Sequence, residues 1–288
     1  MNPSSCSAQQ EKSRDRPKGI KQEVLAYKKK MRKVYTLATF SAIICIGIII
    51  GASLSMQGPP ATADVQKSKT DQIMGGSVID NSHTAALIDP LYATDPDADF
   101  TNSLNKTLQE EGITLDAYEG ATVTVDFLEK LEGGYKLLIL RMHSALSSTE
   151  ELYLFTAEPY DSGKYTQEQQ FQLVKEAYAT ASTQPVFAVN WGFVERLMTG
   201  KFNGTTVIVM GCDGADDPLI SEEFIKQGAV GYVGWNGPVL LSYSDSATLK
   251  LVQDLVLKNQ TLTDAVADTN VQVGPDPASG STLECCTP

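Results

Sequence analysis

A cysteine and a histidine each follow a short apolar segment of this 288-residue chain. Cys212 comes after the segment 205–210, and His143 comes at the end of the segment 135–142. Apolar runs of this length, rich in branched residues, predict buried β-strands. A cysteine becomes nucleophilic when a neighbouring base removes its proton, and histidine is the usual base. The chain has two histidines, and the other, His83, lies ahead of the first predicted strand.

Each of these residues also has a structural interpretation. An isolated cysteine in a strand is most often a small buried hydrophobic residue, and a histidine at a strand end is often only a hydrogen-bonded structural residue. Their matching positions favour a reactive pair, with Cys212 as the nucleophile and His143 as the base.

The elements that would position this pair alternate between strands and helices. Apolar runs predict strands at 84–88, 113–118, 135–142, 152–156, 205–210 and 229–233. Helical spacing predicts helices at 97–110, 125–131, 167–180, 193–198, 218–227, 246–258 and 262–270. This alternation is typical of a three-layer α/β/α sandwich with a mostly parallel sheet. Ligands bind such sheets at the carboxyl ends of the strands, where Cys212 and His143 are expected.

The N-terminal part of the chain has a different composition. Residues 1–33 form a basic tail, and residues 34–56 form an uncharged apolar segment long enough to be a transmembrane helix. The basic flank predicts a cytoplasmic N-terminus and an extracytoplasmic main domain at the cell membrane. A cleaved signal peptide with a site near Ala61-Thr62-Ala63 is the alternative, and we favour a retained signal anchor.

Beyond this anchor we expect three further regions. Residues 57–82 would be a linker, residues 83–273 the α/β domain, and residues 274–288, which contain Cys285 and Cys286, a flexible C-terminal tail. Ten of the 23 basic residues but only three of the 35 acidic residues precede residue 35, so the domain is strongly acidic. An acidic domain argues against nucleic-acid binding, which requires neutralisation of phosphates.

Other kinds of site have little support in the sequence. The cysteines and histidines lack the spacing of a zinc site, and the chain has no phosphate-binding loop or dinucleotide-binding motif. We therefore expect no metal and no cofactor. Glu158 and Asp161 could act as acids, but nothing in the sequence pairs them. Sequons at Asn105, Asn203 and Asn259 would be usable on an exported domain.

Three segments together resemble a known family. They are the strand ending in His143-Ser144, the strand ending in Gly211-Cys212-Asp213, and the stretch 224–235, which reads Phe-Ile-Lys-Gln-Gly-Ala-Val-Gly-Tyr-Val-Gly-Trp. This arrangement resembles the caspase-like cysteine peptidases of clan CD, and most of all the CHAT, gingipain and separase group. The resemblance covers residues 84–270 and is strongest from 135 to 235.

The resemblance implies a role for each matching residue. Cys212 would be the nucleophile, and His143 the general base and then the general acid. The backbone N–H groups of Cys212 and of Ser144 would form the oxyanion hole. The family usually has glycine after the histidine, so Ser144 departs from its pattern.

The substrate implied by the resemblance is a peptide or protein. Asp213, Asp216 and Asp245 could form an acidic pocket for a basic side chain, and Trp235 and Asn236 could line the cleft. The ordinary interpretations are a helix start for the acids near Pro218 and a core position for Trp235. A non-catalytic domain of the same fold, serving as a cell-surface binding or sensor module, is the alternative function.

Overall fold

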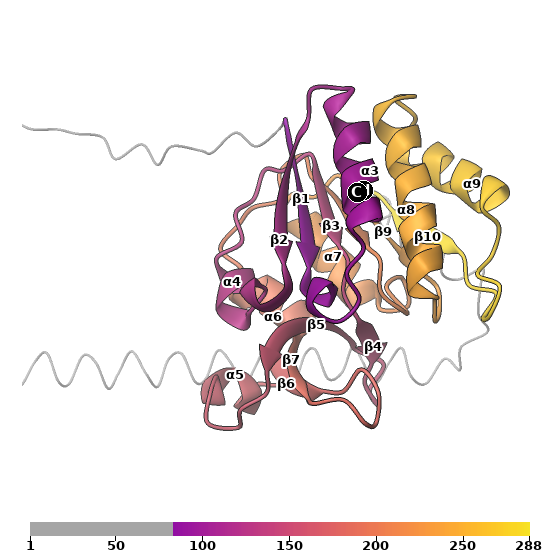
Figure 1. Ribbon diagram of the computed structural model, residues 1–288. Helices are drawn as coiled ribbons and strands as arrows, with labels where there is room; N and C mark the ends of the chain where they lie inside the picture. Colours follow the sequence, from indigo (N-terminus) through magenta and orange to yellow (C-terminus); the bar gives the residue numbers. More distant parts are fainter. Residues whose placement is uncertain (1–82) are drawn as a thin grey trace, which may run out of the picture. The chain divides into compact units, whose positions relative to one another are not determined.

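The computed structural model describes residues 83–288, and its main feature is a six-stranded sheet, here called sheet A (Figure 1). The strand order is β10-β9-β8-β3-β1-β2. The strands are β1 Thr84–Asp89, β2 Thr114–Glu119, β3 Leu137–Leu140, β8 Thr206–Val209, β9 Gly231–Trp235 and β10 Leu283–Cys286. Neighbours from β9 to β2 pair in parallel, and β10 pairs antiparallel with β9. The predicted α/β class with a mostly parallel sheet is confirmed.

Helices cover both faces of sheet A, which explains why its central strands are apolar throughout. Successive strand residues point to opposite faces, so Leu138 and Val207 enter one core while Ile139 and Ile208 enter the other. One face packs against α3 Ala98–Gln109, α8 Leu241–Val256 and α9 Leu262–Gln272, which lie on one side of the sheet in Figure 1. The other face packs against α4 Val125–Glu129, α6 Trp191–Arg196 and α7 Pro218–Lys226.

The helices begin where side chains satisfy their first N–H groups. The carboxylate of Asp97 accepts from Phe100 N ahead of α3, and that of Asp217 accepts from Leu219 N ahead of α7. Such caps supply acceptors that the first helical turn lacks. The helices predicted at 97–110, 218–227, 246–258 and 262–270 are all present, and α8 begins earlier than predicted.

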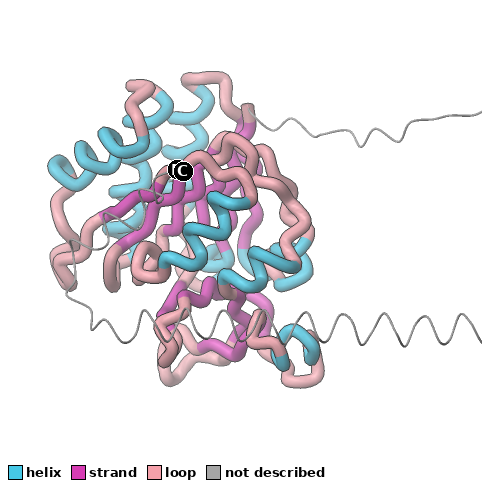
Figure 2. Tube along the Cα trace, turned by 180° about the vertical axis from the view of Figure 1, so that it is seen from behind, coloured by secondary structure: helices cyan, strands magenta, loops and turns pink. Residues whose placement is uncertain are grey.

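A second sheet, sheet B, lies between β3 and β8 in the sequence and was not predicted. It contains β4 Ser144–Leu146, β5 Leu152–Pro159, β7 Val186–Val189 and β6 Val174–Ala177 in the order β4-β5-β7-β6. All of its pairs are antiparallel. Figure 2 shows it as a small sheet below sheet A and the helices that pack on sheet A. Of its strands, only β5 lies in a segment predicted to be a strand, at 152–156.

The prediction of a helix at 167–180 is wrong. Helix α5 covers only Thr166–Gln170, Gln172 adopts a left-handed φ of 57°, and β6 follows. Residues 174–177 pair with β7, which needs a partner for its backbone groups. The helical spacing of this segment is therefore overridden by a long-range pairing that local sequence does not reveal.

The prediction of a loose tail at 274–288 is also wrong in part, because Leu283–Cys286 forms the edge strand β10. Leu283 is buried in the core beside α9, and Asn270 on that helix bonds its backbone N–H and C=O. These contacts bring the C-terminal segment onto the sheet.

The remaining described elements are two short 3₁₀ helices, η2 Pro90–Ala93 and η3 Gly120–Thr122. Within residues 83–288, none of the helices has the length and hydrophobicity needed to cross a bilayer. The predicted tail, anchor and linker of residues 1–82 lie outside the described residues.

Candidate active site

His143 and Cys212 follow neighbouring parallel strands at equivalent positions. β3 pairs with β8 in a register that places Leu140 opposite Val209. His143 lies three residues beyond Leu140, and Cys212 lies three residues beyond Val209. Both residues therefore lie at the carboxyl edge of sheet A, on adjacent loops, which is where ligands bind in sheets of this kind.

A hydrogen bond joins these two loops. The Ser144 hydroxyl donates to the backbone oxygen of Cys212 at 2.6 Å. The close approach requires a glycine at position 211, since a Cβ there would lie 2.2 Å from Ser144 Oγ and 2.5 Å from the Met142 oxygen. Ser144 thus occupies space that a side chain at Gly211 would otherwise fill.

The His143 side chain is exposed, and its ring contacts Phe155 edge to face with the centroids 6.2 Å apart. Desolvation by the surrounding protein lowers its pKa below the ordinary 6.5, and the carboxylate of Asp95 partly opposes that shift. A lowered pKa keeps the imidazole neutral at physiological pH, which is the form that can accept a proton.

The Cys212 thiol is half-buried and contacts the backbone of Val239. Its sulfur accepts a hydrogen bond from Val239 N at 3.4 Å, and its S–H donates to the Val239 oxygen at 3.8 Å. Within residues 83–288, the thiol forms no hydrogen bond with His143. The two loops are adjacent, but the thiol in this structure is bonded to Val239 rather than to the imidazole.

The two backbone N–H groups predicted to form an oxyanion hole belong to Cys212 and Ser144. The N–H of Cys212 donates to no other group among residues 83–288. Phe155 N donates to the His143 oxygen, and Ser144 faces Leu154, so Ser144 belongs to a non-hydrogen-bonded antiparallel pair. In such a pair the N–H points away from the partner strand, which leaves the Ser144 N–H directed away from β5.

The acidic residues suggested for a substrate pocket lie in different settings. Asp213 is half-buried with a left-handed φ of 57°, and Asp216 is buried in the same turn. Asp245 is buried and forms an ion pair with Arg141 at 2.9 Å. Asp213 and Asp216 thus lie next to Cys212 in the turn after β8, whereas Asp245 lies on α8 with its charge engaged.

Trp235 is the last residue of β9 and Asn236 follows it, beside the turn after β8, since Ala215 N donates to the Trp235 oxygen at 2.9 Å. Trp235 is 1% exposed and donates from its ring nitrogen to Ser244 Oγ at 3.0 Å, so it lies in the core between sheet A and α8. Asn236 is half-buried and donates to Thr282 and Glu284 near β10. Both side chains help to join the end of β9 to neighbouring elements.

A buried ionic cluster was not predicted from the sequence. It is centred on Arg141, which lies two residues before His143. Arg141 donates to both oxygens of Asp89 at 3.1 Å and to the two oxygens of Asp245 at 2.9 and 3.1 Å. Desolvation raises the pKa of Asp89 to about 6 despite the nearby guanidinium. The signal was available, because an arginine directly after the apolar run Leu137–Leu140 needs buried partners.

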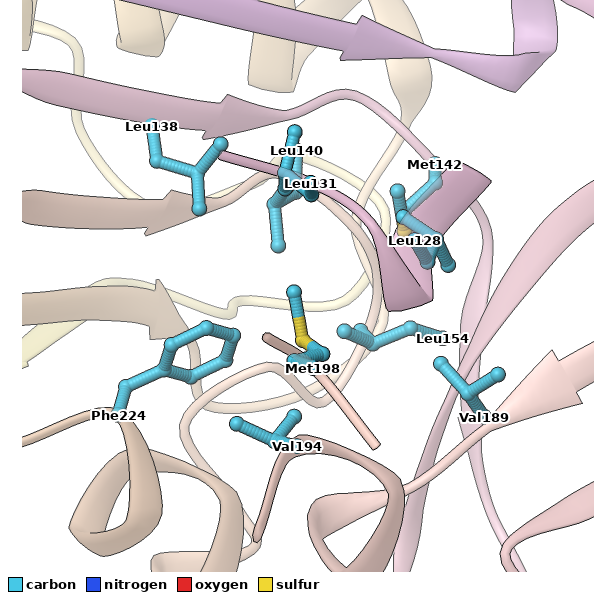
Figure 3. Close-up of a pocket in the computed structure, with 10 residues that line it drawn as sticks. All are labelled: Leu128, Leu131, Leu138, Leu140, Met142, Leu154, Val189, Val194, Met198 and Phe224. Atoms are coloured by element: carbon cyan, nitrogen blue, oxygen red, sulfur yellow. The ribbon is translucent and has the colours of Figure 1, made fainter. Parts of the chain in front are cut away.

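A small apolar pocket lies in the core on the face of sheet A that packs against α4, α6 and α7 (Figure 3). Its walls come from both sheets and from α4, α6 and α7, and they consist of Leu128, Leu131, Leu138, Leu140, Met142, Leu154, Val189, Val194, Met198 and Phe224. All of these side chains are hydrophobic, so the pocket is a packing gap in the core and offers no group for acid–base or nucleophilic chemistry.

Comparisons with models of known protein families and with curated proteins found no relative of this chain. No model of a known protein family matches the chain, and no curated protein is significantly similar to it. Within residues 83–288, no group of three or more His, Cys, Asp or Glu side chains is arranged to hold a metal ion.

Proposed function

We propose that the chain is a membrane-anchored, extracytoplasmic cysteine peptidase with a caspase-like domain and a Cys212–His143 dyad. The observation that carries this proposal is the register of β3 with β8, which brings a thiol and an imidazole to equivalent positions on adjacent loops. The helices on both faces of a mostly parallel sheet are compatible with the caspase-like sandwich that the sequence resembles.

The reaction would be acyl transfer from a peptide to water. His143 would accept the Cys212 proton while the sulfur attacks the peptide carbonyl carbon, and the oxyanion would be bonded by the N–H groups of Cys212 and Ser144. His143 would then donate its proton to the leaving amine, which breaks the C–N bond. Water, deprotonated by the same imidazole, would attack the thioester and release the acid with the thiol restored.

An activity-based labelling experiment tests the dyad. The full chain in detergent is treated with peptides that carry a thiol-reactive electrophile and differ in their terminal side chain, which is basic, acidic or apolar. We expect labelling at Cys212 that is abolished in Cys212→Ala and strongly reduced in His143→Ala. His83→Ala is the matched histidine control and should label like the wild type.

Two results would overturn the peptidase proposal. One is a wild-type chain that no peptide probe labels under conditions in which iodoacetamide modifies Cys212. The other is peptide labelling that is equally fast with and without His143, because a thiol that reacts without its base is not part of a dyad.

The second candidate is a non-catalytic domain of the same fold that binds a partner at the cell surface. The observation that favours it is the pairing of the Cys212 thiol with Val239 instead of His143. A binding module would bind peptide ligands without reacting with their electrophilic analogues, so the same set of probes separates the two functions.

A further inference from the structure

A short loop after β9 covers the Cys212 thiol. We call residues 236–240 the thiol loop, because the N–H and the carbonyl of Val239 bond the sulfur at 3.4 and 3.8 Å. The loop is also bonded to the turn after β8 that carries Cys212, since Asp213 N donates to the Gly237 oxygen at 2.9 Å. The position of the thiol therefore depends on the position of this loop.

The thiol loop is in turn held by a segment near the C-terminus. We call residues 276–282 the strap, because hydrogen bonds join it to both ends of the thiol loop. Ser279 Oγ donates to the Pro238 oxygen at 2.6 Å, and Leu240 N donates to Asp276 Oδ2 at 2.9 Å. At the other end, Asn236 N donates to the Thr282 oxygen at 3.1 Å, and Thr282 N donates to Asn236 Oδ1 at 2.9 Å.

Asp276 is the first residue of the strap and bonds it to Leu240 N of the thiol loop. Its side chain is buried, and its second oxygen accepts from Ala278 N and Ser279 N, both at 2.9 Å. Desolvation alone would raise its pKa, but the backbone hydrogen bonds from Leu240, Ser279 and Ala278 outweigh burial and hold the pKa below its ordinary value. One ionised carboxylate thus organises the strap and fixes the start of α8 beside the thiol loop.

Both hydrogen-bonding functions of the Cys212 thiol are engaged by the thiol loop, since the sulfur accepts from the Val239 N–H and the S–H donates to the Val239 oxygen. The thiol is therefore bonded to Val239 and not to His143, although the loops of Cys212 and His143 are joined through Ser144.

We propose that the strap 276–282 restrains Cys212 by holding the thiol loop against its sulfur, and that release of the strap frees the thiol to bond His143. The restraint is inferred from the contacts of Val239, Pro238 and Leu240 alone. The transfer of the thiol to His143 rests on the proposed function.

Alkylation of Cys212 by iodoacetamide measures the restraint without any substrate. The full chain in detergent is compared with Asp276→Ala, and the rate is read by mass spectrometry on the peptide that contains Cys212. We expect alkylation to be at least about tenfold faster in the variant, because the loss of a single hydrogen bond to a charged group already corresponds to about that factor, and Asp276→Ala removes the bonds from Leu240 N, Ala278 N and Ser279 N.

Asp161→Ala is the matched control. Asp161 makes the same kind of side-chain-to-backbone bond, to Gly163 N at 2.8 Å, in the loop after β5. Its loss should leave Cys212 alkylation unchanged. If Asp276→Ala does not fold, Ser279→Ala removes the bond to Pro238 and the bonds of Ser279 Oγ within the strap, while it keeps the bond from Leu240 N to Asp276. This variant should accelerate alkylation in the same direction.

An alkylation rate that is unchanged or slower in a folded strap variant overturns the restraint. Addition of His143→Ala to Asp276→Ala separates this proposal from the peptidase. Fast alkylation that persists without His143, together with absent peptide labelling of the Asp276→Ala chain that retains His143, supports the restraint and rejects the dyad. Wild-type and Asp276→Ala chains that alkylate equally fast, but whose peptide labelling requires His143, reject the restraint and retain the dyad.

Discussion

Ser144 and Gly211 form a complementary pair at the centre of the candidate site. The peptidases that the sequence resembles usually have glycine after the histidine, whereas this chain has Ser144 at that position. Gly211 supplies the space, because a Cβ at that position would lie 2.2 Å from Ser144 Oγ. The serine hydroxyl then bonds the backbone of Cys212 at 2.6 Å. A side chain after the histidine is therefore compatible with a close approach of the two loops.

The surroundings of the His143 ring predict the pH at which it becomes protonated. Because desolvation lowers its pKa, we expect the ring to titrate below 6.5 and to be neutral at pH 7. A base must be neutral to accept a proton, so any activity that needs it should persist below pH 6.5 and fall as the ring becomes protonated. NMR titration of the ring protons measures the midpoint, with His143→Gln to assign the signals.

Asp95→Asn is the control for this titration. The Asp95 carboxylate opposes the lowering of the His143 pKa, so its removal should move the midpoint further down. A wild-type midpoint above 6.5, or an upward shift in Asp95→Asn, would contradict the proposed environment of the ring.

At the scale of elements, the ionic cluster of Arg141 joins the ends of β1 and β3 to helix α8. Arg141 is 1% exposed and bonds both Asp89 and Asp245. Arg141 lies two residues before His143, so these bonds also fix the segment that leads to the imidazole.

We expect Arg141→Met to lower the free energy of unfolding by roughly 3–5 kcal/mol, because it leaves two carboxylates buried without their cation. Urea denaturation of the full chain in detergent measures this loss. Arg196→Met is the control, since its pair with Glu195 at 3.4 Å is partly exposed and such pairs contribute about 1 kcal/mol or less. Equal losses in the two variants would show that the buried cluster does not stabilise the carboxyl edge of sheet A.

Two elements show how pairing partners override local sequence. Residues 174–177 lie in a segment with helical spacing, yet they form β6 because β7 offers them an unpaired edge. Residues 283–286 lie in a segment rich in Gly, Pro and Ser, yet they form β10 against β9. Each strand is four residues long and too short to be recognised from its own pattern.

At the scale of the whole molecule, the described part combines a mostly parallel sheet with a smaller antiparallel one. The parallel sheet brings His143 and Cys212 to one edge, and sheet B begins directly after His143 with Ser144. Sheet B thus adds a wall beside the candidate site, and the C-terminal strap adds another beside the thiol.

The predicted anchor at residues 34–56 remains a prediction, and it has a direct test. We expect the full chain expressed in cells to stay in the membrane fraction after alkaline extraction, because about 20 apolar residues span a bilayer. Replacement of Ile48, Ile49 and Ile50 by Asp should release it, since charges at the centre of a span oppose insertion. The matched triple Leu variant should stay in the membrane, and a wild-type chain recovered in the soluble fraction would contradict the anchor.

The sequence by itself determined the α/β class, most of the helices and the positions of His143 and Cys212 beyond strand ends. Those features depend on local periodicity, capping residues and chain order, which are all present in a single sequence. Sheet B, the strand β10, the cluster around Arg141 and the contact between Cys212 and Val239 were decided only by the tertiary structure. Each of them depends on groups far apart in the chain, such as Arg141 and Asp245 or Cys212 and Val239. No local pattern records which distant backbone or side-chain group will satisfy a buried polar atom, because that choice is made when the elements pack.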